Sequence, residues 1–279
     1  MSRRNVWAAV AATVVVAATA GIVITATSDG DDTAAPPATT DVALPVPPTE
    51  PEAGPAGEVV VPAASTLVVS FADDIEQFDR PGGAKVGTVA ARWHDRPSVL
   101  PVIDQRPGWL QVRLPQRPNG STAWVRREDV ALASTPYRVV IDVATTRLQV
   151  FRDGVEVLDA PAGLGTDEAP TTVGSFFVAF KQEPPTADEG WGPFVLVTSA
   201  HSETISDFES SGDAIAAIHG PLGAEEQLAA GGGYMSHGCV RLLLDDLAVL
   251  EDLPAGTPID VIDSDAEPPV SAIASTVPS

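Results

Sequence analysis

The sequence predicts a mainly β protein in which a small barrel-like β unit precedes a larger β unit with short helices. Short runs rich in Val, Leu, Phe and Trp recur through the middle of the chain, and Gly- and Pro-containing turns separate them. Little helix is expected, and the clearest helical spacing of leucines is short, at Asp245–Leu253. The length of 279 residues is sufficient for two folded units.

The first element, residues 1–27, predicts an N-terminal membrane anchor. Arg3 and Arg4 precede an uncharged, Ala- and Val-rich run from Val6 to Thr27. Roughly 20 apolar residues cross a bilayer as a helix, whereas the apolar core of a cleaved signal has about 7–15. We therefore expect an uncleaved anchor with a cytoplasmic N-terminus and an extracytoplasmic remainder. A cleaved signal, with secretion to the cell wall, is the alternative.

Two segments have the composition of unfolded chain. Residues 28–64 are rich in Pro, Ala, Thr and acidic side chains, and they predict a disordered linker. Residues 264–279 have a similar character and predict a flexible tail. Such segments cannot bury enough apolar surface to offset the entropy of the chain.

Residues 65–134 predict a small β domain built from short strands and tight turns. Pro107–Val112 followed by Gly120–Val125 resembles a bacterial Src-homology-3-like domain. Trp109 and Trp124 in this pattern are interpreted as core aromatics, with a ligand-binding face as the alternative. The predicted strands are 67–69, 86–89, 99–102, 109–114 and 123–125.

Residues 135–263 predict the larger β unit. Asp153-Gly154 is a typical hairpin turn between two of its strands. The helix at Asp245–Leu253 is expected to stop at Pro254. The predicted strands are 138–143, 147–151, 155–158, 174–180, 194–197 and the closing strand 257–262.

The charge balance excludes several classes of partner. The chain has 16 Lys and Arg against 38 Asp and Glu, a formal net charge of −22. Phosphates would be repelled by such a surface, so no nucleic-acid partner is expected. The single cysteine, Cys239, cannot form an intramolecular disulfide.

Residues that could act in catalysis cluster around Cys239, in the stretch Ser236–Arg241. His237 precedes it by two positions, and His219 lies upstream. A thiol attacks an acyl carbon as its thiolate, and an imidazole can accept the proton. Spacing alone does not decide which of the two histidines is the base. A zinc site made of the three residues is a weaker alternative, because no ligand-pair spacing is present.

Glycines near the cysteine suggest where an oxyanion could be bound. Gly238 and Gly231–Gly233 carry no side chain that would obstruct a backbone N–H. We therefore expect these N–H groups to be available as oxyanion donors.

A pair of motifs resembles the signature of the YkuD-type L,D-transpeptidases. His219, the first residue of His219-Gly220, is followed after the 16 residues 220–235 by Ser236–Arg241. Ala169–Phe176 resembles the Pro-Thr-Gly segment of that family. The resemblance extends from Tyr137 to Asp263 and implies a largely β catalytic domain.

The resemblance implies a role for each motif residue. Cys239 would be the nucleophile and His219 the proton donor and acceptor, with the carbonyl of Gly220 orienting the imidazole ring. His237 would support oxyanion or substrate binding. Arg241, together with Ser236 and Gly238, is assigned to substrate binding. Arg241 would bind a substrate carboxylate or hold the loop through an ion pair.

The implied reaction is transfer between peptidoglycan stem peptides. Cys239 would form a thioester with a tetrapeptide stem and release its terminal D-alanine, and an amine would then accept the acyl group to give a crosslink or an anchoring link. No cofactor and no metal are implied, and carbapenem-type β-lactams are possible inhibitors.

Two other functions stay open at this point. The same thioester would make an L,D-carboxypeptidase if water accepted the acyl group, and other Cys-His wall hydrolases belong to this class. A non-catalytic cell-wall-binding protein is the second alternative. Outside the motifs, His94 is expected at the surface, His201 in a structural role and Trp191 in packing.

Overall fold

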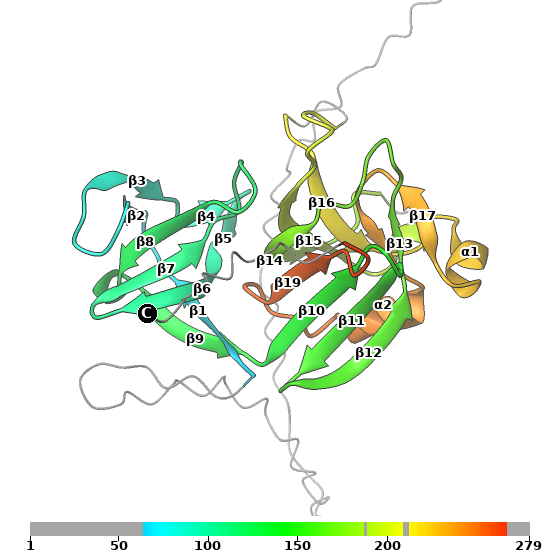
Figure 1. Cartoon of the computed structure of the whole chain (residues 1–279), viewed down its shortest axis with the longest axis horizontal. Helices are drawn as coiled ribbons and strands as arrows, with labels where there is room; N and C mark the ends of the chain where they lie inside the picture. The colour runs from blue at the N-terminus through cyan, green and yellow to red at the C-terminus, as the bar shows by residue number, and fades with distance from the viewer. Residues whose placement is uncertain (1–63, 187–188, 209–211, 267–279) are drawn as a thin grey trace, which may run out of the picture. The chain divides into compact units, whose positions relative to one another are not determined.

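The computed structural model describes residues 64–186, 189–208 and 212–266. They form two large sheets and a two-stranded hairpin (Figure 1). The mainly β class predicted from the sequence is confirmed. The assignments of residues 1–27, 28–63 and 267–279 to an anchor, a linker and a tail lie outside the described part. Among the described helices, none has the length and apolar character needed to cross a membrane.

The first sheet has seven strands in the order β3-β2-β8-β7-β6-β1-β9. Every pairing in it is antiparallel. The small hairpin β4–β5 lies between β3 and β6 in the chain, and the short 3-10 helix η1 follows β8. The elements are β1 Thr66–Ser70, β2 Ile75–Phe78, β3 Lys85–Val89, β4 Arg92–Trp93, β5 Arg96–Pro97, β6 Val99–Arg106, β7 Trp109–Arg113, β8 Thr122–Arg126, η1 Arg127–Asp129 and β9 Ala131–Thr135.

The second sheet has ten strands in the order β12-β11-β10-β19-β14-β15-β16-β18-β13-β17. Two short α-helices and one 3-10 helix, η2, accompany it. The elements are β10 Tyr137–Asp142, β11 Arg147–Arg152, β12 Val155–Pro161, β13 Gly163–Gly165, β14 Gly174–Gln182, η2 Glu189–Trp191, β15 Val195–His201, β16 Ile215–His219, α1 Glu225–Ala229, β17 Gly233–Ser236, β18 Val240–Arg241, α2 Leu244–Val249 and β19 Pro258–Ile262.

The turn predicted at Asp153-Gly154 joins β11 to β12. Both residues have positive φ, 52° and 78°, as a two-residue type I′ hairpin requires. Along β11, Leu148 and Val150 are fully buried while their neighbours are more exposed. This alternation is typical of a strand with one face on a core.

Strand β14 contributes to two hydrophobic cores. Phe176 and Val178 belong to the core of the second sheet. Phe177 and Ala179 point the other way, since successive side chains of a strand alternate, and they belong to the core of the first sheet. The first sheet therefore completes its core with residues from the second. Whether residues 65–134 form an independent domain, and one similar to the Src-homology-3-like class, stays a prediction.

The predicted helix at 245–253 is shorter than expected. Helix α2 ends at Val249, and the following N–H groups of Leu250 and Leu253 bond to carbonyls three residues back, at Leu247 and Leu250. Such tighter turns replace the α-helical pattern near a terminus. The three leucines are nevertheless buried, as their spacing predicted.

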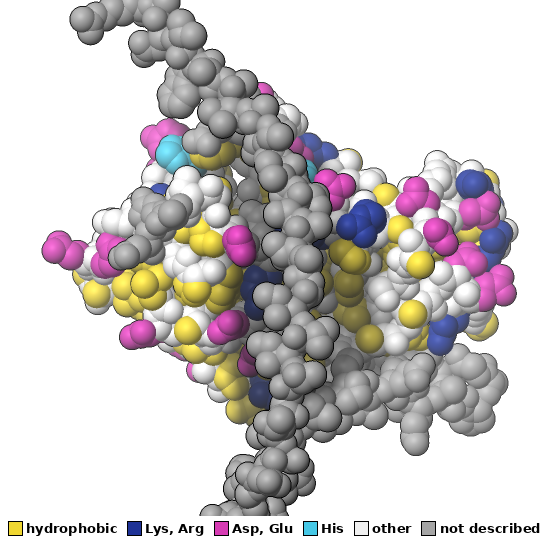
Figure 2. Space-filling model, turned by 180° about the vertical axis from the view of Figure 1, so that it is seen from behind, with side chains coloured by type: hydrophobic (Ala, Val, Ile, Leu, Met, Phe, Trp, Pro, Cys, Tyr) yellow, Lys and Arg dark blue, Asp and Glu magenta, His cyan; other side chains and the backbone are white. Residues whose placement is uncertain are grey.

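Acidic side chains are spread over the surface among basic ones. On the face shown in Figure 2, acidic and basic side chains are interspersed rather than gathered in one block. Exposed pairs such as Arg147–Asp159 at 2.6 Å and Arg138–Asp260 at 2.8 Å join neighbouring strands. Pairs of this kind contribute little to stability, about 0–1 kcal/mol each.

Candidate active site

The residues singled out around the cysteine line one large cavity. It has a volume of about 1000 Å³, and its walls include His219, His237, Cys239 and Arg241. A volume of this size is at the upper end for a small-molecule site, about 300–1,000 Å³. All the candidate residues except the orienting Gly220 therefore face a space large enough for a peptide.

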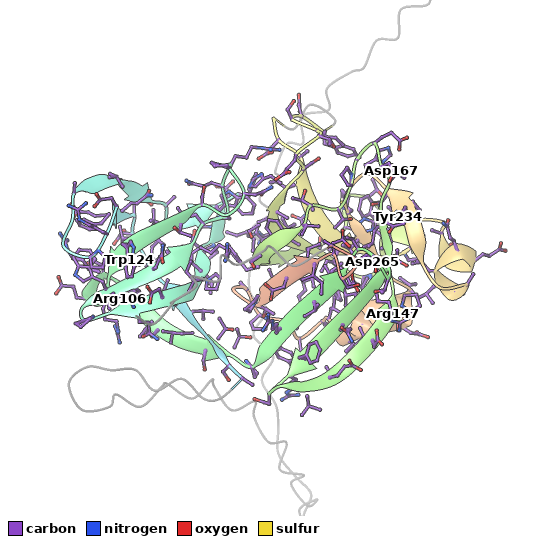
Figure 3. All side chains as sticks on the ribbon, viewed as in Figure 1. Arg106, Trp124, Arg147, Asp167, Tyr234 and Asp265 are labelled. Atoms are coloured by element: carbon purple, nitrogen blue, oxygen red, sulfur yellow. The ribbon has the colours of Figure 1, made fainter. Side chains whose placement is uncertain are left out.

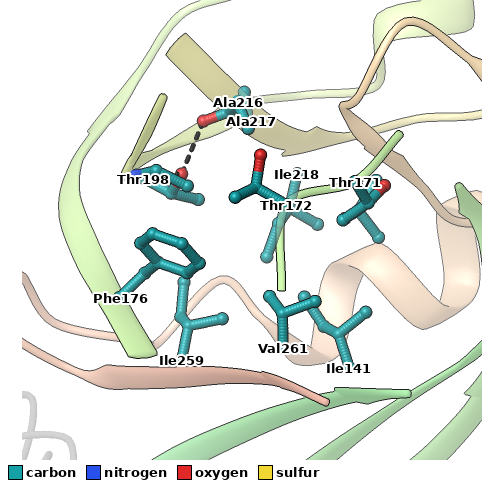
Figure 4. A pocket seen from close by; sticks show the side chains of 12 residues that line it. Ile141, Thr171, Thr172, Phe176, Thr198, Ala216, Ala217, Ile218, Ile259 and Val261 are labelled. Atoms are coloured by element: carbon teal, nitrogen blue, oxygen red, sulfur yellow. Dashed lines mark hydrogen bonds between the residues drawn. The ribbon is translucent and has the colours of Figure 1, made fainter. Parts of the chain in front are cut away.

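A second cavity, within the core of the second sheet, has a different character. It measures about 20 Å³ and is mostly apolar, and Figure 4 shows the hydrogen bond between Thr198 and the Ala216 carbonyl at its edge. This space admits about one water molecule, so it is a packing gap rather than a substrate site.

Strand pairing places the histidine and the cysteine on one face. β16 and β18 are parallel, with Ile218 opposite Val240 and His219 opposite Arg241. Cys239 immediately precedes β18. Because side chains two apart in extended chain share a face, Cys239 and Arg241 point to the same side as His219.

His219 is held in one orientation by its own loop. It is 2% exposed, and its Nδ1 lies 2.8 Å from the carbonyl oxygen of Gly220. A carbonyl only accepts, so Nδ1 carries the proton and Nε2 of the neutral ring is free to accept one. The ring of Trp191 packs against the imidazole with centroids 4.6 Å apart.

Gly220 must be glycine at this position. Its N–H donates to the Trp191 carbonyl at 2.8 Å, so the two backbones run close together. A Cβ atom on Gly220 would lie 2.6 Å from the carbonyl oxygen of Gly190. Such a distance is far inside van der Waals contact. The 3-10 helix η2 thus packs directly on the backbone that orients His219.

The titration of the two reacting groups is set mainly by burial. Burial lowers the pKa of His219 from 6.5 to about 4; the hydrogen bond with Gly220 opposes this, and the charge of Arg241 adds to it. Burial raises the pKa of the Cys239 thiol, although a hydrogen bond from the Ala217 backbone and the charge of Arg241 favour the thiolate. At neutral pH the pair therefore rests as neutral thiol and neutral imidazole.

The loop before Cys239 is braced from inside. Ser236 Oγ donates to the Cys239 carbonyl at 2.6 Å and accepts from the Gly238 N–H at 3.1 Å. Ser236 is 2% exposed. The hydroxyl of Thr171 donates to the Gly238 carbonyl at 3.2 Å and accepts from the Gly165 N–H at 2.9 Å. This geometry favours a positioning role for Ser236 over the substrate contact predicted for it.

The expectation that the glycines offer free N–H groups was wrong. The N–H of Gly238 is bonded to Ser236, and the N–H groups of Gly231, Gly232 and Gly233 donate to backbone carbonyls. A tightly turning loop brings backbone N–H groups next to nearby carbonyls, so a glycine without a side chain still donates its N–H locally. By contrast, no hydrogen bond joins the N–H of Cys239 to another described residue.

His237 lies at the mouth of the cavity. Its side chain is exposed, and its ring centroid is 6.2 Å from that of Phe208, on the segment between β15 and β16. His219 is instead buried and oriented by a hydrogen bond. Of the two histidines that spacing left open, His219 has the environment of a positioned base.

Arg241 presents an unpaired cation to the cavity. Its Nε is buried without a hydrogen-bond partner, and no carboxylate of the described residues forms an ion pair with it. The side chain as a whole is half-buried, and a buried N–H donor without a partner is costly. Of the two roles considered for Arg241, this favours binding of a substrate carboxylate over a structural ion pair.

The other histidines differ from each other. His201 is buried, and its Nδ1 lies 2.8 Å from Oδ2 of Asp213. His94 is exposed and lines the large cavity from the hairpin β4–β5. Within the described ranges no group of three or more His, Cys, Asp or Glu side chains is arranged to hold a metal ion.

Two contributors to the site were not assigned a role from the sequence. Thr171 braces Gly238, and the Ala217 backbone favours the thiolate of Cys239. Trp191, expected in packing, packs on His219. Thr171 lies in the 169–176 segment singled out for its Pro-Thr-Gly pattern, so that pattern was the available signal. No local signal marks Ala217, because strand pairing brings it to the site.

Comparison with known proteins gives one match by family. Residues 136–261 match the YkuD family, described as the L,D-transpeptidase catalytic domain. No curated protein sequence matches the chain.

Solved structures of this kind show limited likeness. An L,D-transpeptidase from Mycobacterium smegmatis is 18% identical, with 57% of this chain and 79% of that chain covered and a TM-score of 0.37. L,D-transpeptidase 3 from Mycobacterium tuberculosis, in complex with a faropenem-derived adduct, is 18% identical, with 53% and 76% covered and a TM-score of 0.36. An L,D-transpeptidase from Xylanimonas cellulosilytica is 21% identical, with 46% and 61% covered and a TM-score of 0.33.

The assignment therefore rests on the family match and on the site that it contains. The matched range includes His219, the braced loop before Cys239, and Arg241. Residues 136–261 of this chain are similar to the L,D-transpeptidase catalytic domain of the YkuD family.

Proposed function

We propose that the Cys239 cavity catalyses L,D-transpeptidation of peptidoglycan stem peptides. The observation that carries the proposal is that one cavity is lined both by the only thiol of the chain and by an imidazole whose free nitrogen is defined. Nδ1 of His219 donates to Gly220, so Nε2 is the nitrogen left to exchange a proton. A nucleophile, a base and a group that orients the base are the parts of covalent acyl transfer.

The first half-reaction forms a thioester and releases D-alanine. Sγ of Cys239 attacks the carbonyl carbon of the bond to the terminal D-alanine, and the thiol proton moves to Nε2 of His219. The tetrahedral intermediate then breaks its C–N bond, and His219 returns the proton to the leaving amine. In the second half-reaction an acceptor amine attacks the thioester, and His219 carries its proton to the departing sulfur.

Proton transfer accompanies attack in this scheme. The raised pKa of the Cys239 thiol and the lowered pKa of His219 disfavour a preformed thiolate–imidazolium pair. The positive charge of Arg241 and the Ala217 backbone stabilise negative charge on sulfur as it develops. The N–H of Cys239 is the donor available to the oxyanion. His237 is assigned to binding at the cavity mouth.

Arg241 is assigned to the C-terminal carboxylate of the donor stem. It lies two residues from the nucleophile on the same face, and its guanidinium has no carboxylate partner of its own among the described residues. A bidentate guanidinium–carboxylate pair would fix the scissile bond relative to Sγ.

Product analysis tests the reaction and separates it from hydrolysis. Purified protein is incubated with a tetrapeptide-stem muropeptide, with and without an acceptor stem that bears a free amine. Release of D-alanine together with a crosslinked product supports transpeptidation. Release with only a shortened stem assigns the site to L,D-carboxypeptidase chemistry. A folded protein that binds stems and releases no D-alanine supports the wall-binding alternative.

Carbapenem-type β-lactams are proposed as covalent inhibitors. A strained lactam carbonyl offers Sγ the same kind of electrophile as the donor stem. We expect a single adduct at Cys239 by intact-protein mass spectrometry, lost in Cys239→Ser. An adduct that persists in Cys239→Ser would contradict this.

The proposed substrate lies outside the cytoplasm, so the function requires export. Anchoring through residues 1–27 stays a proposal, with secretion to the wall as its alternative. Fractionation with N-terminal sequencing distinguishes them, because a soluble mature chain that starts beyond Thr27 would show cleavage.

A further inference from the structure

The hairpin β4–β5 of the first half of the chain reaches the cavity that holds Cys239. His94, Asp95 and Arg96 line this cavity together with residues of the second sheet. They precede the family-matched range, which begins at residue 136. The cavity is therefore not built by the matched domain alone.

Aromatic packing fixes this hairpin against the second sheet. The ring of Trp93 lies 5.9 Å from that of Phe180 on β14 and 6.3 Å from that of His201 on β15. His94 packs edge-on against Trp93, with centroids 4.4 Å apart. The hairpin tip is thus held in place rather than extended freely into solvent.

The turn of the hairpin has the conformation of an ordinary two-residue hairpin. His94 and Asp95 lie between the paired residues Trp93 and Arg96, and both have positive φ, 47° and 58°, as a type I′ turn requires. The guanidinium of Arg92 donates to the Asp95 carbonyl and supports the turn.

Charge on the cavity wall indicates what the hairpin binds. Arg96 is exposed and forms no ion pair with a described residue. Arg241 is likewise unpaired on the same cavity. Asp213, a carboxylate on this wall, already bonds to Arg117 and lies beside His201. Asp95 also lines this cavity without an ion pair to a described residue, so the wall as a whole is not positive, and an anionic group is favoured only locally, at Arg96 and Arg241.

We propose that the β4–β5 hairpin is a substrate-binding element, in which Arg96 binds an internal carboxylate of the donor stem peptide. The proposal rests on the proposed function, which assigns the C-terminal carboxylate of the donor to Arg241. Arg96 then takes a second carboxylate farther along the same peptide. Guanidinium groups bind carboxylates through two parallel hydrogen bonds, which gives selectivity over the neutral carboxamide.

The test compares two donors that differ only in that group. One tetrapeptide stem carries a free internal carboxylate, and the other carries a carboxamide at the same position. Arg96→Ala is expected to lower kcat/KM for D-alanine release from the carboxylate donor on the order of 10- to 100-fold, as loss of a charged hydrogen bond predicts. For the carboxamide donor, Arg96→Ala is expected to change kcat/KM by less than about twofold. Arg96→Lys should restore part of the selectivity.

Arg106→Ala is the matched control. Arg106 is an exposed arginine of the first sheet, paired with Asp104 at 2.6 Å, and it does not line the cavity (Figure 3). Its substitution should leave both donors unchanged. Equal loss of both donors in Arg96→Ala would indicate a structural effect and overturn the proposal, as would no loss with either.

A binding measurement separates this proposal from the proposed function. Both stems are titrated into the Cys239→Ala protein, with and without Arg96→Ala. If binding depends on the carboxylate and requires Arg96, the hairpin site is supported. If the wild type then releases no D-alanine, the transpeptidase assignment is refuted while the hairpin site stands. D-alanine release by the wild type with identical values in Arg96→Ala would refute the hairpin site alone.

Discussion

His219 combines two constraints in one side chain. Its ring is almost fully buried, which favours the neutral form, and the Gly220 carbonyl fixes which nitrogen carries the proton. A base with a pKa of about 4 is already deprotonated at neutral pH, and it therefore accepts a proton without first losing one. The cost is a weaker driving force for proton transfer. The charge of Arg241 acts on both groups, because it favours the thiolate of Cys239 and disfavours the imidazolium of His219.

The lowered pKa of His219 predicts a loss of stability in mild acid. Between pH 6.5 and about 4 the unfolded chain binds a proton at this residue and the folded chain does not, so the free energy of unfolding falls as the pH falls. The full effect is about 3 kcal/mol at 1.36 kcal/mol per pH unit. Urea unfolding at several pH values should show this loss in the wild type and not in His219→Asn. Parallel pH profiles for the two proteins would contradict the assigned pKa.

Ser236→Ala tests the internal brace of the nucleophile loop. The change removes the acceptor of the Gly238 N–H and the donor to the Cys239 carbonyl, both inside the protein. Leaving these two backbone groups without partners costs about 1–3 kcal/mol. We expect the less ordered loop to slow acylation roughly tenfold or more. Stopped-flow or mass-spectrometric acylation rates measure this.

Ser175→Ala provides the control for that change. Ser175 is an exposed serine of β14 whose hydroxyl bonds to Asp260, away from the cavity. Its removal should leave the acylation rate at the wild-type value. If Ser236→Ala also acylates at that rate, the brace does not position the nucleophile.

At the scale of elements, the loop between β7 and β8 supports one wall of the cavity. Arg117 donates to the carbonyls of Ser202 and Ile205 and to the carboxylate of Asp213. Asn119 exchanges two hydrogen bonds with the backbone of His201, at 2.7 and 3.0 Å. These contacts hold the segment after β15, which carries Phe208 beside His237.

Arg117→Ala should therefore loosen residues 202–208. We expect faster amide hydrogen exchange in that segment and a lower kcat/KM for the donor stem, because charged hydrogen bonds of this kind are each worth about 1.5–3 kcal/mol. Arg138→Ala, which breaks a surface pair with Asp260, is the control. Unchanged exchange in residues 202–208 would show that the segment is held by other contacts.

Sequence reasoning found the elements whose signal is local and missed those that depend on pairing. β11, β12 and the turn at Asp153-Gly154 follow from alternation and turn chemistry. β13 and β18 have three and two residues, too few for a periodic pattern, and they exist because neighbouring strands supply partners. Cys239, His219 and Arg241 were found because motif spacing marks them. The hairpin contribution of Arg96 was not, because it comes from a distant part of the chain.

At the scale of the whole molecule, the two sheets share their packing. Phe177 on β14 is 1% exposed within the core of the first sheet, whereas its neighbour Phe176 packs in the core of the second. A Cβ atom on Gly256, in the loop before β19, would meet the Val68 side chain of β1 at 2.8 Å. The contacts explain how a hairpin from one half of the chain can line a cavity of the other.

Phe177→Ala should destabilise both halves together. Removing a buried phenylalanine costs about 3–5 kcal/mol, and the cavity would open between the two cores. We expect a single unfolding transition with a lower midpoint. The fluorescence of the half-buried Trp124 of the first sheet (Figure 3) and the loss of D-alanine release should report the same midpoint. Phe208→Ala, at an exposed phenylalanine, should leave the midpoint unchanged. Loss of the Trp124 signal while release persists would show that the sheets unfold independently.

Direct detection of the acyl-enzyme tests whether Cys239 is the nucleophile and His219 its proton carrier. Wild-type protein, Cys239→Ala and His219→Ala are each mixed with a tetrapeptide stem, quenched in acid and examined by intact-protein mass spectrometry with peptide mapping. We expect an adduct of the stem minus D-alanine on Cys239 in the wild type, none in Cys239→Ala, and formation slowed by about 100-fold or more in His219→Ala. An adduct in folded Cys239→Ala, or wild-type acylation in His219→Ala, would contradict these roles.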